Sequence, residues 1–179
     1  MTRKYISPFK PKNFPKFKPQ HFEIFTFKAG FKKKDKDLLI IIFNKLVPVS
    51  AVYSKSSTPS APILWDKKVE SNSCKVLIVN SGNANAFTGI VGLTAIKKYA
   101  KVASYLFNCK TNEVFVSSTG VIGEQLNPDL IIKKLNFLKS YSSGNILEAA
   151  QAIMTTDTYP KIAKEIVRNN NNKIFICSL

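Results

Sequence analysis

The chain has 179 residues and a formal net charge of +16, from 27 Lys and Arg residues against 11 Asp and Glu. Hydrophobic residues make up 45% and charged residues 21%, values close to globular averages that exclude a wholly disordered chain. This length favours one domain with a sizeable core over a repeat array or a multidomain assembly.

The first twenty residues predict an irregular basic arm. Prolines at positions 8, 11, 15 and 19 alternate with lysines and remove backbone donors every few residues, which prevents a regular helix or a central strand. Its lysines and phenylalanines could bind the phosphates and bases of a nucleic acid, but no zinc-finger, helix-turn-helix or aromatic RNA-binding motif is present. A solvated lysine-rich surface is the preferred interpretation, and residues 21–179 are expected to form the folded domain.

Short apolar runs, several of them β-branched, predict the strands of a buried sheet. Small and amide residues follow the third and fourth of these runs and predict a turn after each, while two prolines predict a loop over Ser56–Ile63. The predicted strands are Asp37–Phe43, Pro48–Ser54, Lys75–Val79, Val114–Ser117 and Lys173–Cys177.

Three segments predict helices. The first has apolar residues every three or four positions with lysines between them, as in an amphipathic helix. Asn127 and Pro128 are typical of a helix start, and Pro160 is expected to stop the third helix. The alternation of strands and helices indicates an α/β fold with layers of helices and sheets. The predicted helices are Leu93–Phe107, Leu130–Leu138 and Asn145–Met154.

Few residues are available for metal or nucleotide chemistry. His21 is the single histidine, so no multi-histidine metal site can form, and a solvated surface role is preferred for it. Phosphate-binding glycine motifs are absent, so we expect no nucleotide cofactor. We expect no metal either, because a single histidine supplies too few ligands. Cys74, Cys109 and Cys177 are widely spaced and predict free buried thiols in a reducing, cytoplasmic compartment. The longest apolar run, Leu38–Phe43, is too short to span a bilayer.

Two small-residue segments are candidate functional sites. Ser117–Gly120 directly follows a strand, and the backbone N–H groups of such a turn can point at one oxygen, which is the geometry of an oxyanion site. Asn80, Asn83 and Asn85 tolerate left-handed conformations and supply amide donors. From composition alone, two ordinary strand-to-helix turns explain the pattern equally well.

Three longer segments carry a resemblance to a known family. NSGNANAFTG (Asn80–Gly89), SSTGVIGEQL (Ser117–Leu126) and AIMTTDTYPK (Ala152–Lys161) are similar, in order and spacing, to signature segments of the bifunctional glutamate N-acetyltransferase and ornithine acetyltransferase family of arginine biosynthesis. AGFK (Ala29–Lys32) and SAPI (Ser60–Ile63) are weaker similarities.

The resemblance implies an α/β layered sandwich and an acyltransferase that cuts itself between an Ala and a Thr, giving an α chain and a β chain. The freed threonine is nucleophile and, through its own α-amine, general base, so no histidine is needed. The enzyme would pass acetyl from N-acetylornithine, and in bifunctional members from acetyl-CoA, to glutamate by a ping-pong route. Thr119 and Gly120 would form the oxyanion hole, and Thr155 or Thr156 would bind substrate. Two α chains would assemble with two β chains.

The sequence also departs from the family pattern. Neither the K-G-x-G-M segment nor the A-T-M-L segment that holds the cleavage site occurs among the 179 residues. We therefore expect an α-chain region that is incomplete at its C-terminus and inactive alone, through a frameshift at the A-rich codons of NNNNKIF, a pseudogene truncation or a split gene. The alternatives are a basic nucleic-acid-associated protein that uses the arm, and a fragment that docks with a separately encoded β chain.

Overall fold

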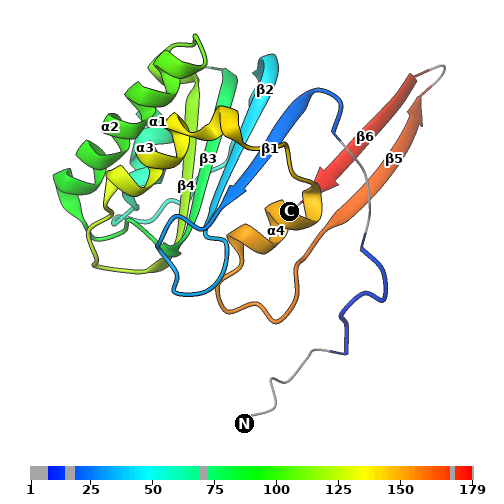
Figure 1. Cartoon of the computed structure of the whole chain (residues 1–179), viewed down its shortest axis with the longest axis horizontal. Helices are drawn as coiled ribbons and strands as arrows, with labels where there is room; N and C mark the ends of the chain where they lie inside the picture. Colours follow the sequence, from blue (N-terminus) through cyan, green and yellow to red (C-terminus); the bar gives the residue numbers. More distant parts are fainter. Residues whose placement is uncertain (1–7, 15–18, 69–71, 170–171, 179) are drawn as a thin grey trace.

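The computed structural model describes residues 8–14, 19–68, 72–169 and 172–178 and has a mixed α/β architecture (Figure 1). The expected α/β layering is confirmed. In chain order the elements, with η for a 3-10 helix, are β1 (Phe22–Phe27), β2 (Leu38–Pro48), α1 (Ala61–Lys68), β3 (Ser73–Asn83), α2 (Gly89–Leu106), η1 (Thr111–Glu113), β4 (Val114–Val121), α3 (Pro128–Asn136), η2 (Leu138–Ser140), α4 (Ile146–Ile153), β5 (Ala163–Asn169) and β6 (Asn172–Ser178).

Strands β1 to β4 form one sheet in the order β1-β2-β3-β4. The first three pair antiparallel, whereas β3 and β4 pair parallel and are joined through α2. The apolar run of β2 is buried on both faces of the sheet, which explains why it is continuous rather than alternating. A row of buried side chains crosses the sheet at Phe25, Ile40, Ile78 and Val116.

Helices cover both faces of this sheet (Figure 1). On one face α1, α2 and α3 pack over residues such as Ile40 and Ile78, and Tyr99 of α2 is fully buried there. Strand alternation sends Leu39 and Ile41 to the opposite face, where they pack against α4. Helix α4 packs against β1, β2 and β3 on this face, whereas Ser117 of β4 is exposed.

The predicted helices are confirmed, with shifted ends. α2 begins a turn earlier than expected, at Gly89. α3 and α4 are each capped by an asparagine, because the side-chain oxygens of Asn127 and Asn145 accept backbone N–H groups of the first turn. α4 ends at Ile153, well before Pro160, so the proline is not what stops it.

Two predictions between β2 and β3 are wrong. Residues 49–54 form no strand, because Pro48 pairs with Ser73 and β3 begins there, so the next residues have no partner in the ladder. The loop predicted over residues 56–63 ends at Ser60, and α1 begins at Ala61. Pro62 lies in the first turn of α1, where a missing N–H interrupts no helical hydrogen bond.

The turns expected after Val79 and Ser117 are also absent. β3 continues to Asn83 and β4 to Val121, because the two segments of small residues pair with each other. Strand β6 confirms the prediction near the end of the chain. It pairs with β5, a strand not predicted from the sequence, in a hairpin that projects from the rest of the molecule (Figure 1).

Within the predicted arm, residues 8–14 form turns and bends, while residues 1–7 and 15–18 lie outside the described part. None of the helices that the structure describes is long and apolar enough to cross a membrane. The three cysteines are free, but only Cys74 is buried; Cys109 is half-buried and Cys177 is exposed, so the expectation of buried thiols holds for Cys74 alone.

Candidate active site

The carboxyl ends of the parallel strands β3 and β4 lie together, which is where open α/β sheets bind ligands. Thr119 is the ladder neighbour of Ser81, and Gly120 is the neighbour of Gly82. Thr119 is half-buried and Gly120 is exposed. Two of the four predicted site residues therefore lie at this end of the sheet.

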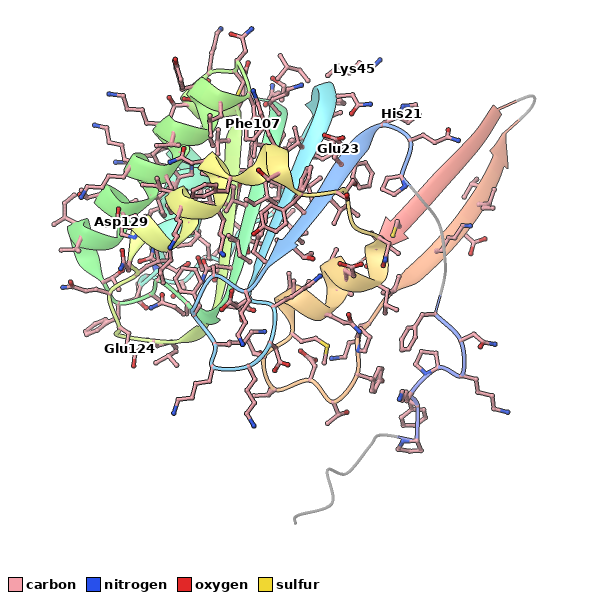
Figure 2. The ribbon with its side chains drawn as sticks, in the orientation of Figure 1. His21, Glu23, Lys45, Phe107, Glu124 and Asp129 are labelled. Carbon is pink, nitrogen blue, oxygen red and sulfur yellow. The ribbon has the colours of Figure 1, made fainter. Side chains whose placement is uncertain are left out.

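The loops that leave the two strands run together. The Ala84 N–H donates to Val121 O at 2.8 Å, and Asn83 Nδ2 donates to Glu124 O at 3.0 Å. Figure 2 shows Glu124 at this end of the sheet, opposite the end that carries Lys45. The loops after β3 and β4 thus form one structural unit.

Gly82 and Gly120 allow three backbone segments to lie in contact. Their φ values are +106° and +135°. A Cβ at Gly120 would lie 2.3 Å from the carbonyl carbon of Gly82, and a Cβ at Gly82 would lie 2.6 Å from Phe31 O. A side chain at either position would clash with main chain, so both glycines are required by close approach as well as by conformation.

Helix α1 partly covers the outer edge of β4, the edge that faces away from β3. Trp65 Nε1 donates to Val114 O at 3.0 Å, and the Val116 N–H donates to Asp66 Oδ1 at 3.1 Å. The backbone groups of alternate residues point to the same edge of a strand. The even-numbered residues of β4 therefore direct their N–H and C=O groups outward.

By this alternation the Gly120 N–H faces the outer edge, whereas the Thr119 N–H faces β3. The hydrogen bond from the Ala84 N–H to Val121 O supports this alternation, because it places the carbonyl group of another odd-numbered residue on the β3 side. The expectation that both amides of a tight turn point at one oxygen is therefore wrong. The Gly120 N–H is the amide that points away from β3.

The end of α4 is tied to the same end of the sheet. Ser81 Oγ donates to Ala152 O at 2.6 Å, and Lys32 Nζ donates to Met154 O at 3.0 Å. Thr155 and Thr156 follow directly and are exposed. Because Ser81 is also the ladder neighbour of Thr119, the two segments that carry predicted site residues are joined through one serine.

The asparagines at the end of β3 and in the loop that follows it act inside the protein. Asn80 Nδ2 donates to Asn83 O at 2.8 Å, and Asn85 Nδ2 donates to Gly92 O at 3.2 Å. Asn85 is fully buried with a φ of +44°, and it ties the loop to the first turn of α2. Their amide donors are used within the fold, so a structural role is the better interpretation of these residues.

A buried carboxylate organises the loop before β2. Asp37 is fully buried, and its oxygens accept the N–H groups of Ala29, Gly30 and Lys32 at 2.6, 3.0 and 2.8 Å. No sequence motif points to Asp37 as a functional residue. The signal that could have found it is an acidic residue that directly precedes a run of five buried apolar residues and follows a glycine-containing loop.

Burial shifts the pKa values of two groups near the sheet, Lys32 and Asp66. Burial lowers the pKa of Lys32 from its ordinary value, and the nearby Asp35 and Asp37 carboxylates oppose this change. Burial raises the pKa of Asp66 to about 7, although the hydrogen bond from Val116 acts in the opposite direction. In the described ranges, no group of three or more His, Cys, Asp or Glu side chains is placed to hold a metal ion.

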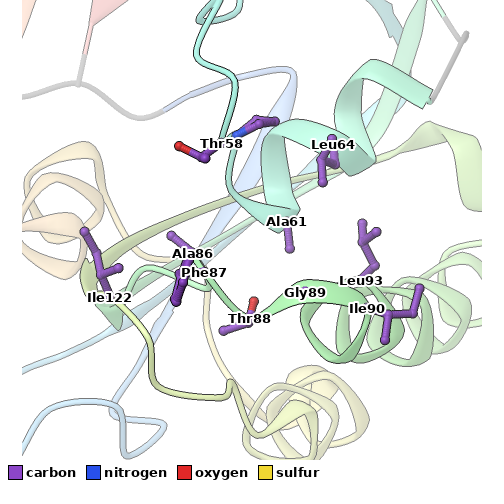
Figure 3. Close-up of a pocket in the computed structure, with 11 residues that line it drawn as sticks. Thr58, Ala61, Leu64, Ala86, Phe87, Thr88, Gly89, Ile90, Leu93 and Ile122 are labelled. Atoms are coloured by element: carbon purple, nitrogen blue, oxygen red, sulfur yellow. The ribbon is translucent and has the colours of Figure 1, made fainter.

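An apolar pocket of about 520 Å³ lies beside the loops that follow β3 and β4 (Figure 3). Its walls come from the start of α1, the start of α2, the Ala86–Gly89 loop and Ile122. Phe87, Ile90 and Ile122 are 87%, 75% and 70% exposed, so the pocket is an open apolar surface rather than an enclosed cavity. None of the four predicted site residues lines it.

Comparison with known proteins decides the family, because a model described as the ArgJ family matches residues 23–178. The chain belongs to the ArgJ family. The arginine biosynthesis bifunctional protein ArgJ of Bradyrhizobium diazoefficiens is 39% identical over 175 residues, which cover 96% of this chain and 42% of that relative. The ArgJ protein of Mesorhizobium japonicum is 41% identical over 175 residues with the same two coverages. The chain thus spans less than half the length of these curated relatives.

Solved structures of ArgJ proteins share the fold. Arginine biosynthesis bifunctional protein ArgJ from Bacillus halodurans has a TM-score of 0.80 and 29% identity, over 88% of this chain and 84% of that chain. Ornithine acetyltransferase complexed with ornithine, from Mycobacterium tuberculosis, has a TM-score of 0.76 and 27% identity, over 89% and 88% of the two chains. The resemblance inferred from the sequence is confirmed, and the comparisons do not favour the nucleic-acid alternative.

Proposed function

We propose that this chain forms the α-chain part of an acetyltransferase of arginine biosynthesis, which takes acetyl from N-acetylornithine and passes it to glutamate. Membership in the ArgJ family supports the proposal, as does the relative that was solved with ornithine. The observation that carries it is the role of Ser81, which lies beside Thr119 in the sheet and donates to Ala152 O just before the threonine pair.

In the proposed site, Gly120 and Thr119 stabilise the negative charge that develops on the acetyl oxygen during transfer. The Gly120 N–H and the Thr119 hydroxyl are the two donors, and the ladder with β3 fixes their backbone before substrate arrives. Donors that are already in place need no reorganisation in the transition state. The absence of a Cβ at Gly120 allows the β3 main chain to approach closely, which holds the Gly120 backbone in place. Thr155 or Thr156 holds the substrate beside them.

The nucleophile in this proposal is the N-terminal threonine of a β chain, whose own amine acts as base. No A-T-M-L segment occurs in the 179 residues. The solved chains are covered to 84% and 88% by this chain, whereas the curated relatives are covered to 42%, which supports a division of the enzyme into two chains. The assembly would hold two α and two β chains in the cytoplasm, and a bifunctional form would also accept acetyl-CoA.

Co-production of this chain with the β chain of a curated relative tests the proposal. The purified pair is expected to form N-acetylglutamate from N-acetylornithine and glutamate. Thr119→Ala should lower the turnover number by about 10²- to 10³-fold, the effect of one lost oxyanion donor. Thr119→Ser keeps the hydroxyl and should retain most of the activity. If the two chains co-purify without transferring acetyl, the proposed function is wrong; unchanged turnover in Thr119→Ala would remove Thr119 from the mechanism.

A further inference from the structure

Lys32 crosses the carboxyl end of β3. A Cβ at Gly82 would lie 3.0 Å from Lys32 Cγ, so the side-chain stem rests against the strand at the ladder neighbour of Gly120. The ammonium group then reaches Met154 O at the end of α4, at 3.0 Å. Lys32 therefore places a positive charge between the strand end that carries the oxyanion candidates and the segment that begins with Thr155.

The backbone of Lys32 is held in place by its own loop. Its N–H donates to the buried Asp37 carboxylate at 2.8 Å, in company with the N–H groups of Ala29 and Gly30. Asp37 is fully buried and its oxygens are occupied by these backbone donors. The carboxylate thus fixes the loop.

The Lys32 ammonium keeps donors for a further partner. An ammonium has three N–H donors, and the hydrogen bond to Met154 O uses one of them. The ion pairs in residues 8–14, 19–68, 72–169 and 172–178 join Lys36 to Glu148 and Lys161 to Asp157. Within these ranges, then, no carboxylate lies within 4.0 Å of the Lys32 nitrogen, and a half-buried cation is held by a neutral oxygen.

We propose that Lys32 binds the α-carboxylate of the amino-acid substrate at this site. The inference rests on the proposed function, because N-acetylornithine and glutamate both carry this group. One cation would then position the acetyl donor in the first half of the reaction and the acceptor in the second. A hydrogen bond from an ammonium to a carboxylate is charge-assisted and about twice as strong as a neutral one.

A lysine that merely capped α4 would show a different behaviour. It would stabilise the last carbonyl oxygens of the helix, and its loss would lower stability without changing which ligands the chain prefers. Preference for a carboxylate is therefore the property that separates recognition from capping. N-acetylputrescine is N-acetylornithine without the carboxylate, so the two compounds form a matched pair of probes.

The test is isothermal titration calorimetry of the full chain with N-acetylornithine and with N-acetylputrescine. The wild-type chain should bind N-acetylornithine at least about tenfold more tightly, the effect of one charge-assisted hydrogen bond. Lys32→Met should bind the two compounds alike, and Lys32→Arg should recover part of the preference. Lys33→Met, which removes an exposed neighbouring lysine, is the control and should behave as wild type. Thermal unfolding checks that each variant is folded.

The outcomes separate this inference from the proposed function. Equal binding of the two compounds by the wild-type chain would overturn the role of Lys32 and leave acetyl transfer standing. An undiminished preference in folded Lys32→Met would likewise overturn it, since another group would then read the carboxylate. Failure of the wild-type chain to bind either compound would overturn the proposed site together with the inference.

Discussion

Gly120 and Gly123 both adopt positive φ values, +135° and +88°, but their surroundings differ. A Cβ at Gly120 would lie 2.3 Å from the Gly82 carbonyl carbon, whereas a Cβ at Gly123 would meet nothing within 4 Å. Gly123→Ala should therefore cost about 1 kcal/mol of backbone strain, and Gly120→Ala about 3 kcal/mol because main chain must also move. Urea unfolding of the full chain measures both losses; equal values would contradict the close backbone contact.

Asp66 makes stability depend on pH. Burial raises the pKa of this carboxyl from 3.8 to about 7, so between these values the folded chain holds a proton that the unfolded chain releases. The free energy of unfolding should therefore fall as the pH rises from about 4 to about 7, on account of this group. Asp66→Asn keeps an oxygen for the Val116 N–H and removes the titration.

The Asp66→Asn variant should accordingly show a flatter stability profile over this range and exceed wild type at pH 8 by about 1–2 kcal/mol, which allows for partial solvation of the carboxyl. Chemical unfolding at several pH values measures the profile. Parallel profiles for wild type and Asp66→Asn would show that Asp66 titrates normally.

Among the elements, the loop between β3 and α2 depends on Asn85. Its carbonyl oxygen accepts the Ala61 N–H at 3.0 Å, its Nδ2 donates to Gly92 O at 3.2 Å, and its Oδ1 accepts from Thr88 at 2.9 Å. Asn85→Ala should cost about 2–4 kcal/mol, because buried groups lose partners and a left-handed conformation becomes less favourable.

The loss in Asn85→Ala should be visible as faster amide hydrogen exchange at the starts of α1 and α2, which this side chain and its backbone connect. Thr94→Ala, which removes an exposed hydroxyl bonded within α2, is the control. Exchange that accelerates evenly over the whole chain, or not at all, would contradict a local role for Asn85.

Helices and strands that are determined by a pattern within their own residues could be predicted from the sequence. The spacing of apolar residues in α2 and the capping asparagines of α3 and α4 are such signals. The last residues of β3 and β4 could not be predicted, since small and amide residues favour turns and only pairing between distant segments makes them strand. For the same reason the strand predicted over residues 48–54 is wrong beyond Pro48. Residues 49–54 have a high β-propensity, but no neighbouring strand pairs with them.

For the molecule as a whole, the family and the layered α/β fold could be inferred from three motifs, but the arrangement of the site could not. The motifs supplied Thr119, Gly120 and the threonine pair. They gave no reason to expect that a strand alternation directs the Gly120 N–H outward and the Thr119 N–H inward. The contribution of Asp37 and Lys32 also depends on contacts between distant segments, which no local pattern encodes.

The central claim is that the carboxyl end of β3 and β4, joined to the end of α4 through Ser81, binds the acetylated substrate. Chemical-shift mapping of the full ¹⁵N-labelled chain during titration with N-acetylornithine tests it most directly. We predict saturable shifts that are largest at the amides of Thr119, Gly120, Thr155 and Thr156. Shifts confined to the apolar pocket around Phe87, or no saturable shifts at all, would contradict the claim.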